Sequence, residues 1–247
     1  VKIGNLPERA LTDKEFKGFS NSAMKKAAIN VTENYKGLEI LLTDPDRCLE
    51  VVSKQLSQAT IPKEKMILAS ILGILGNNKG SSILTDTVHQ HTTWDEGWHY
   101  TGMGQFGMCL SPLDALVTAL GNSKDSSALP TILEKAKQLE PEDYFSHFRA
   151  MATEAIGSKE AIPILAMMLS KPGVRNHAIL SYTEARARTV PGQNDTSTRN
   201  LALKELHLAR ALYLCGDHNG MGEAVLRRYA NGLQGHYARY ANEILNK

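Results

Sequence analysis

The chain has 247 residues, of which 42% are hydrophobic, and its formal net charge is +2. This length suffices for one large core or one extended repeat array, and a near-neutral charge does not demand a polyanionic partner such as duplex DNA. No apolar run reaches the roughly 18 residues of a membrane helix, so we expect no membrane partner. The three cysteines, Cys48, Cys109 and Cys215, indicate neither a disulfide framework nor a thiolate metal site, because they are far apart and odd in number.

The first residues leave the compartment open. Because the chain begins at Val1 and not at methionine, a leader or an upstream domain could have been removed. We therefore expect either a cytoplasmic or a periplasmic location, depending on what precedes Val1. Residues 1–37 are expected to form an extension or a capping segment, and residues 38–247 a helical domain. Within that domain, residues 38–58 could supply a degenerate first helix pair.

Helical periodicity begins clearly at residues 63–76, KEKMILASILGILG. Apolar and small residues recur there at spacings of three and four, which predicts the buried face of a packed helix. These residues are Met66, Ile67, Ser70, Ile71 and Ile74. Alternation with period two is not sustained anywhere in the chain, so a β-sheet is not expected.

Four segments share a pattern of an apolar helix, a glycine, a short polar turn and a second helix. They are residues 69–88, 115–133, 150–169 and 207–229. The glycines are Gly76, Gly121, Gly157 and Gly216. We expect each glycine to end the first helix in the left-handed conformation. Asn122–Ser123 and Ser158–Lys159 are expected to begin the next helices, and Ala69, Ala119 and Ala155 to let paired helices approach closely. Because each pair exposes an apolar face that only another pair can bury, the prediction is an all-α fold, a curved α-α superhelix.

An insertion at residues 89–112 interrupts this pattern. It holds both tryptophans, two further aromatic residues and four glycines between residues 97 and 107. Because four glycines inside a helix would cost about 1 kcal/mol each, we expect a loop. The loop is either an Ω-type plug packed on the helices or a surface that presents aromatic side chains to a partner. The expected division is Trp94 and Phe106 buried, and Trp98, His99 and Tyr100 exposed.

Residues 102–107, GMGQFG, match the G-x-G-x-x-G pattern of dinucleotide-binding loops. That pattern requires a strand directly before it and a helix that starts within it. The preceding WDEGWHYT is not typical of a buried strand, and we expect the next helix to begin only at Ser111–Pro112, an N-cap followed by proline. The prediction is therefore that the chain binds no cofactor and that, in isolation, it retains neither FAD nor NAD.

The same insertion offers a set of metal-ligating residue types: His89, His91, Asp95, Glu96 and His99. Their spacing fits no tight metal-binding pattern, such as two histidines four residues apart on a helix. Histidines beside an aromatic loop are the commoner case, and we predict no metal site.

A second insertion covers residues 171–200. Pro172–Gly173 is expected to end one helix, and residues 178–188 to form one short helix that carries two arginines. The segment 191–198, PGQNDTST, has the composition of a loop. The whole insertion is interpreted as a connecting excursion with solvated charges.

The C-terminal stretch interleaves basic and aromatic residues: Arg227, Arg228, Tyr229, His236, Tyr237, Arg239 and Tyr240. Single-stranded nucleic acid or an acidic peptide would use such a combination. Because residues 199–247 carry seven Lys/Arg against four Asp/Glu, we do not expect nucleic acid as a partner. Capping of the helical array is the alternative interpretation.

The turn segments LGNSKDSSALP (120–130) and IGSKEAIP (156–163) resemble HEAT repeats, in particular the short variety of phycobilisome-lyase-related proteins. The resemblance covers residues 60–247 and, more weakly, residues 38–58. A further resemblance spans about residues 94–240. There WDEGWHYTGMGQFG, LDALVTALG, FSHFRAMA and LALKELHLARALYLCGDHNGMG are similar to the C-terminal helical region of bacterial FAD-dependent oxidoreductases. In those proteins the flavin loop lies in a separate Rossmann-type domain, so the resemblance implies no catalytic residue here.

Two functions remain open. The first is a non-catalytic scaffold or interaction module whose aromatic loop contacts another protein or a sibling domain. The second is an accessory domain of an FAD-dependent oxidoreductase, in which Asp95, His99 and Gln105 would contribute to a composite site. The candidate binding residues are Trp94, Asp95, Trp98, His99, Tyr100, Gln105, Phe106, Arg227 and Arg228.

Overall fold

The structure is a computed structural model that describes residues 12, 14, 44–95, 111–143, 145–152, 157–188 and 196–247. These residues are 72% helical and contain no strand, so the prediction of an all-α fold is confirmed. Most of the expected extension 1–37 lies outside the described residues, as do the GMGQFG segment and Cys109.

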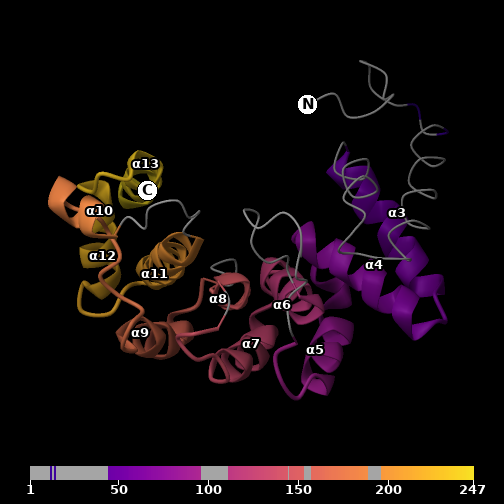
Figure 1. Cartoon of the computed structure of the whole chain (residues 1–247). Coiled ribbons are helices and arrows are strands. Elements are labelled where there is room, and N and C mark those ends of the chain that lie inside the picture. Colours follow the sequence, from indigo (N-terminus) through magenta and orange to yellow (C-terminus); the bar gives the residue numbers. More distant parts are fainter. Residues whose placement is uncertain are drawn as a thin grey trace.

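The described helices follow one another from the α3–α4 end to the α12–α13 end (Figure 1). Their bounds are α3 (Pro45–Gln58), α4 (Pro62–Ile74), α5 (Ser81–Gln90), α6 (Pro112–Asn122), α7 (Leu129–Ala136), α8 (Phe145–Met151), α9 (Ile162–Ser170), α10 (Tyr182–Arg188), α11 (Thr196–Leu214), α12 (Met221–Ala230) and α13 (Gly235–Leu245). Short 3-10 helices precede three of them: η1 (Asn78–Gly80) before α5, η2 (Ser126–Ala128) before α7 and η4 (Lys159–Ala161) before α9.

The four expected helix pairs correspond to α4–α5, α6–α7, α8–α9 and α11–α12. The first helices of these pairs also contact one another in order, because α4 packs against α6, α6 against α8 and α8 against α11. The described residues 44–58 contain a single helix, α3, which packs against α4. The described part of the degenerate first pair is therefore one helix.

Helix α6 begins where the sequence indicated. Ser111 is its N-cap and Pro112 its first residue. The Ser111 hydroxyl oxygen accepts a hydrogen bond from the Asp114 N–H at 3.0 Å, and the Asp114 carboxylate accepts one from the Ser111 N–H at 3.0 Å. This reciprocal capping box satisfies two backbone donors that a helix start leaves without intrahelical partners.

Three of the four predicted glycine turns are confirmed. Gly76, Gly157 and Gly216 adopt φ of 77°, 55° and 117°, a region that L-residues avoid. The prediction for Gly121 is wrong, because Gly121 lies inside α6 and is buried. The left-handed residue of that turn is Lys124, with φ 59°.

In the turns at Gly76, Lys124 and Gly157, the residue after the left-handed position caps the following 3-10 helix. The side chains of Asn77, Asp125 and Ser158 accept hydrogen bonds from the N–H groups of Lys79, Ser127 and Glu160, respectively. Ser158 was predicted to start a helix in this way, and that is confirmed. Asn122–Ser123 was not the correct start, because α6 continues through Asn122 and the capping residue is Asp125.

Small residues set the distance between neighbouring helices, as expected for Ala69 and Ala119. A Cβ placed on Gly80 would lie 2.5 Å from Ala69 Cβ, and one on Gly73 would lie 2.4 Å from the Ala119 carbonyl oxygen. The backbones therefore approach more closely than any larger side chain would permit. Ala155 lies outside the described residues.

The apolar stripe predicted for residues 63–76 is only part of what α4 buries. Ile67, Ser70 and Ile71 are buried as expected, and so are Leu68 and Leu72 on other sides of the helix, since α4 packs against α3, α5 and α6. Ile74 contradicts the prediction: it is 38% exposed, because it is the last residue of α4.

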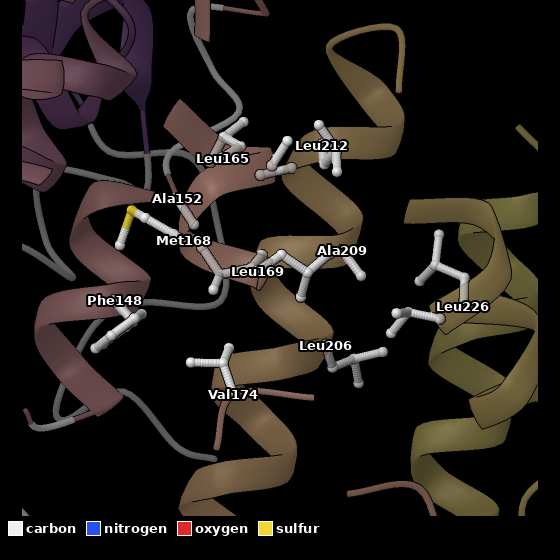
Figure 2. Packing of buried hydrophobic residues seen from close by; sticks show 14 of the residues in the cluster. Phe148, Ala152, Leu165, Met168, Leu169, Val174, Leu206, Ala209, Leu212 and Leu226 are labelled. Carbon is white, nitrogen blue, oxygen red and sulfur yellow. The ribbon is translucent and has the colours of Figure 1, made fainter. Parts of the chain in front are cut away.

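The largest described core runs from α7 to α13. Figure 2 shows Leu206, Ala209 and Leu212 along α11, between Leu169 of α9 and Leu226 of α12. Two smaller clusters fill the space between α3 and α4 and between α4 and α8. Each cluster is built by helices that are close in sequence, so the core is extended along the chain.

The second insertion differs in detail from its prediction. Helix α9 ends at Ser170, before Gly173 with φ 81°, as expected from Pro172–Gly173. The short helix is α10, which starts at Tyr182, four residues later than the predicted start at 178. Helix α11 begins at Thr196, so the last residues of the expected polar loop are helical.

Candidate functional site

The residues on either side of segment 96–110 are bound to each other. Both carboxylate oxygens of Asp95 accept a hydrogen bond from the Leu113 N–H, at 3.3 and 3.2 Å. Leu113 is in the first turn of α6, where free N–H groups and the helix dipole favour a negative charge. The residue that directly precedes segment 96–110 is therefore in contact with the helix that follows the segment.

Trp94 attaches the same point to the helices. Its ring is half-buried and packs against two of the hydrophobic clusters. Its indole N–H donates to the Lys135 carbonyl oxygen at 3.1 Å, and its ring centroid lies 4.8 Å from that of His147. The prediction that Trp94 is buried is thus confirmed in part, and its contacts are those of a structural anchor.

A buried hydrogen bond lies beneath these anchors. His147 Nδ1 lies 2.7 Å from Asp114 Oδ1, and the two side chains are 4% and 0% exposed. An ionised carboxylate only accepts hydrogen bonds, so Nδ1 is the donor. The other carboxylate oxygen of Asp114 accepts from Ser111 N–H. Asp114 therefore connects α8 with the residue that directly follows segment 96–110.

Lys135 completes the polar cluster. It is 3% exposed, and its ammonium group donates to the carbonyl oxygen of His91. That contact fixes the chain three residues before Trp94. The cluster formed by Trp94, Asp95, Asp114, Lys135 and His147 is called the anchor cluster below.

The histidines of the suggested metal set have other partners. His91 Nδ1 lies 2.9 Å from the Thr87 carbonyl oxygen, and His89 Nε2 lies 3.1 Å from the Thr131 hydroxyl. Within the described ranges, no group of three or more His, Cys, Asp or Glu side chains could hold a metal ion. Glu96 and His99 lie outside those ranges.

Only four of the nine candidate binding residues are described. Trp94 and Asp95 belong to the anchor cluster, whereas Arg227 and Arg228 are exposed on α12. Arg227 Nε donates to Glu223 Oε1 at 2.8 Å one turn earlier on the same helix. The other five lie outside the described residues: Trp98, His99, Tyr100, Gln105 and Phe106.

The basic and aromatic residues at the C-terminus do not form one surface, contrary to the interpretation from composition. Tyr229 and Tyr237 are 1% and 6% exposed and belong to the core. The Tyr229 hydroxyl donates to the buried Glu205 carboxylate at 2.8 Å, and burial raises the pKa of this phenol. These two rings therefore cannot stack on nucleic-acid bases.

His207 of α11 lies beside one of these C-terminal side chains. Its ring centroid is 6.1 Å from that of Tyr240, whose hydroxyl accepts a hydrogen bond from Arg210. Burial, together with the nearby charges of Arg149 and Arg210, lowers the pKa of His207 to about 4. The imidazole is therefore neutral at physiological pH.

Sequence reasoning missed Asp114, Lys135 and His147. Asp114 follows Ser111–Pro112 at the third helical position, which is the local signal of a capping box. Its pairing with His147, 33 residues away, has no local signal, since it depends on how α6 and α8 pack. Lys135 resembles any other lysine of an amphipathic helix.

Among the residues that the structure describes, no helix has the length and the apolar character needed to cross a membrane. Comparisons with protein-family models, with curated proteins and with solved structures found no match to this chain.

Proposed function

We propose that the chain is a non-catalytic helical-repeat scaffold, HEAT-like in architecture, that presents segment 96–110 to another protein or to a sibling domain. The repeat architecture is supported by the order in which α4, α6, α8 and α11 pack. It is also supported by three turns that share a left-handed residue, a capping side chain and a 3-10 helix. Residues 38–247 would form this domain, with insertions near 89–112 and 171–200.

One observation carries the functional part of the proposal: the two ends of segment 96–110 meet at the Asp95–Leu113 contact. A loop that returns to its starting point on a rigid scaffold is a common carrier of binding function. The anchor cluster supplies the rigid base, because its members on α6, α7 and α8, Asp114, Lys135 and His147, are buried and hydrogen-bonded.

The composition of the segment favours a protein partner. Trp98, Tyr100 and Phe106 are residue types that dominate hot spots of protein interfaces. Anchoring both ends reduces the conformational freedom that a loop loses when it binds, which raises affinity. Trp94 and Asp95, in this proposal, position the segment, while the aromatic residues beyond them contact the partner.

The proposal is tested by photocrosslinking, followed by a measurement of affinity. A photoreactive phenylalanine analogue at position 98 should give a defined protein adduct, whereas the same analogue at Ile61, an exposed site 60% accessible on another part of the chain, should not. Trp98→Ala should then weaken binding of the purified partner about 30-fold, the equivalent of about 2 kcal/mol.

Equal affinities of the Trp98→Ala variant and the unaltered protein would contradict the proposal. The alternative, an accessory domain of an FAD-dependent oxidoreductase, predicts that the crosslinked partner is a flavoprotein or a flavin domain. A flavin absorption band in the purified chain itself would contradict the expectation that this chain binds no cofactor.

A further inference from the structure

Helix α10 is held at the surface without a hydrophobic face. None of its seven residues is buried, and a helix this short is marginal on its own. Its position depends on polar contacts at both ends. Ser181 Oγ accepts from the Glu184 N–H at 3.2 Å and the Glu184 carboxylate accepts from the Leu180 N–H at 2.8 Å. At the other end, Arg188 donates to the carbonyl oxygens of His177 and Asn176 at 3.1 and 3.2 Å.

The residues just before α10 are joined to the loop between α12 and α13. The Leu233 N–H donates to the Ile179 carbonyl oxygen at 2.8 Å, and the Ile179 N–H donates to the Gln234 side-chain oxygen at 3.4 Å. Figure 1 shows α10 at the same end of the molecule as α12 and α13. Segments that are about 50 residues apart in the sequence therefore form one corner.

This corner exposes large apolar side chains. Leu180, Tyr182 and Leu233 are 41%, 76% and 56% exposed. The described residues include seven exposed large hydrophobic side chains, and the Leu233–Ile179 hydrogen bond brings three of them to one corner. Grouped apolar residues on a surface mark contact sites more often than single ones do.

The unpaired charges around the corner are mostly positive, because Glu205 is 1% exposed and accepts hydrogen bonds from the Asn176 and His177 N–H groups, and Glu223 is paired with Arg227. Residues 172–188 contain three arginines and one glutamate, and residues 224–240 contain three arginines and no carboxylate. The carboxylate of that glutamate, Glu184, already accepts a hydrogen bond from the Leu180 N–H. The Leu180 N–H, with Arg188 and Arg228 nearby, lowers the pKa of its carboxyl group. Arg186 and Arg228 are exposed, so their guanidinium groups can attract a negatively charged partner by complementarity.

We propose that Leu180, Tyr182 and Leu233, flanked by Arg186 and Arg228, form a docking surface for an acidic peptide segment that carries one apolar or aromatic anchor residue. Carboxylates of the peptide would pair with the guanidinium groups in a planar geometry that suits arginine, and the anchor would cover the apolar side chains. This surface uses none of residues 96–110 and does not depend on the function proposed for them.

A peptide fits the corner better than the other anionic partners. Of the three exposed apolar side chains only Tyr182 is aromatic, whereas single-stranded nucleic acid is bound by stacking successive bases on several aromatic side chains. Three apolar side chains also bury far less area than the continuous apolar face with which an amphipathic helix enters a lipid interface.

The probe is an array of synthetic peptides made of aspartate and glutamate with a single Leu, Phe or Trp, whose position in the peptide is varied across the array. Binding of each peptide to the full chain is measured by fluorescence anisotropy. Saturable binding to members of this array is expected, and it should weaken as salt is raised. Leu233→Ser and Arg228→Glu should each weaken it at least tenfold. Ile61→Ser is the matched control, because Ile61 is 60% exposed and Leu233 is 56% exposed, and it should leave binding unchanged.

Since all three altered side chains are exposed, the variants should keep the melting temperature of the unaltered protein. Absence of saturable binding across the array would overturn the proposal, as would equal weakening by Ile61→Ser. Tighter binding of oligothymidylate, or of vesicles containing phosphatidylserine, than of every peptide would also overturn it, in favour of a nucleic acid or a membrane surface.

Discussion

Replacing Asp114 by asparagine tests how strongly the anchor cluster holds the structure. The Asp114 side chain is fully buried, and its two oxygens accept hydrogen bonds from His147 Nδ1 at 2.7 Å and from the Ser111 N–H at 3.0 Å. An amide retains one acceptor oxygen and turns an N–H₂ group toward the other donor. Leaving a buried hydrogen-bond donor without its acceptor costs about 1–3 kcal/mol, so Asp114→Asn should reduce the free energy of unfolding by about that amount.

The assay is urea-induced unfolding followed by far-UV circular dichroism. Asp46→Asn is the matched control, because Asp46 also lies in the first turn of a helix but is exposed, and it should cost at most about 1 kcal/mol. In a double-mutant cycle with His147→Gln, the double variant should lose less than the sum of the single losses, because both changes remove the same contact. A loss below about 1 kcal/mol for Asp114→Asn, or strict additivity in the cycle, would refute the reasoning.

Three further predictions concern packing, titration and thiol reactivity. In chemical unfolding, Gly80→Ala should destabilise the fold by about 1–3 kcal/mol, because the new Cβ would lie 2.5 Å from Ala69 Cβ. Gly235 has open space around it, so Gly235→Ala should be neutral or stabilising in the same measurement. The folded-state pKa of His207, about 4, lies below its usual 6.5. The unfolded chain therefore takes up the proton first as the pH falls, and roughly 3 kcal/mol of stability present above pH 6.5 should be lost toward pH 4. Unfolding curves of His207→Gln should lack this part of the loss. The same dependence of stability on pH in His207→Gln and in the unaltered protein would contradict the assignment. Burial raises the pKa of the Cys48 thiol to about 12, so in a Cys109→Ser/Cys215→Ser background it should react with Ellman's reagent only after unfolding, and rapid labelling of the folded protein would show that Cys48 is accessible.

Local chemistry explains which parts of the fold could be predicted. The start of α6 followed from Ser111 and Pro112, because an N-cap and a proline at the first helical position act on the adjacent backbone. Gly76, Gly157 and Gly216 followed from the low cost of a left-handed conformation at glycine. The same argument failed at Gly121, since the chain placed Lys124 in that conformation and kept the glycine inside α6.

Long-range packing explains what could not be predicted. The pattern of Arg227 to Tyr240 was compatible with a basic aromatic surface, but Tyr229 and Tyr237 turn into the core that α11 and α12 form. Asp114 and His147 meet only because α6 packs against α8. Nothing within a few residues of either one indicates that partner.

The central claim is that segment 96–110 contacts a partner while the residues at its base hold the structure. Its most direct test compares the two tryptophans of the chain, as Trp94→Ala and Trp98→Ala, in urea unfolding. Trp94→Ala should reduce the free energy of unfolding by roughly 2–3 kcal/mol, somewhat less than for a fully buried ring, because Trp94 is half-buried, packs on two clusters and donates to Lys135. Trp98→Ala should change it by less than about 1 kcal/mol. A loss of about 3–5 kcal/mol for Trp98→Ala would show that this ring seals the helices and would contradict the account.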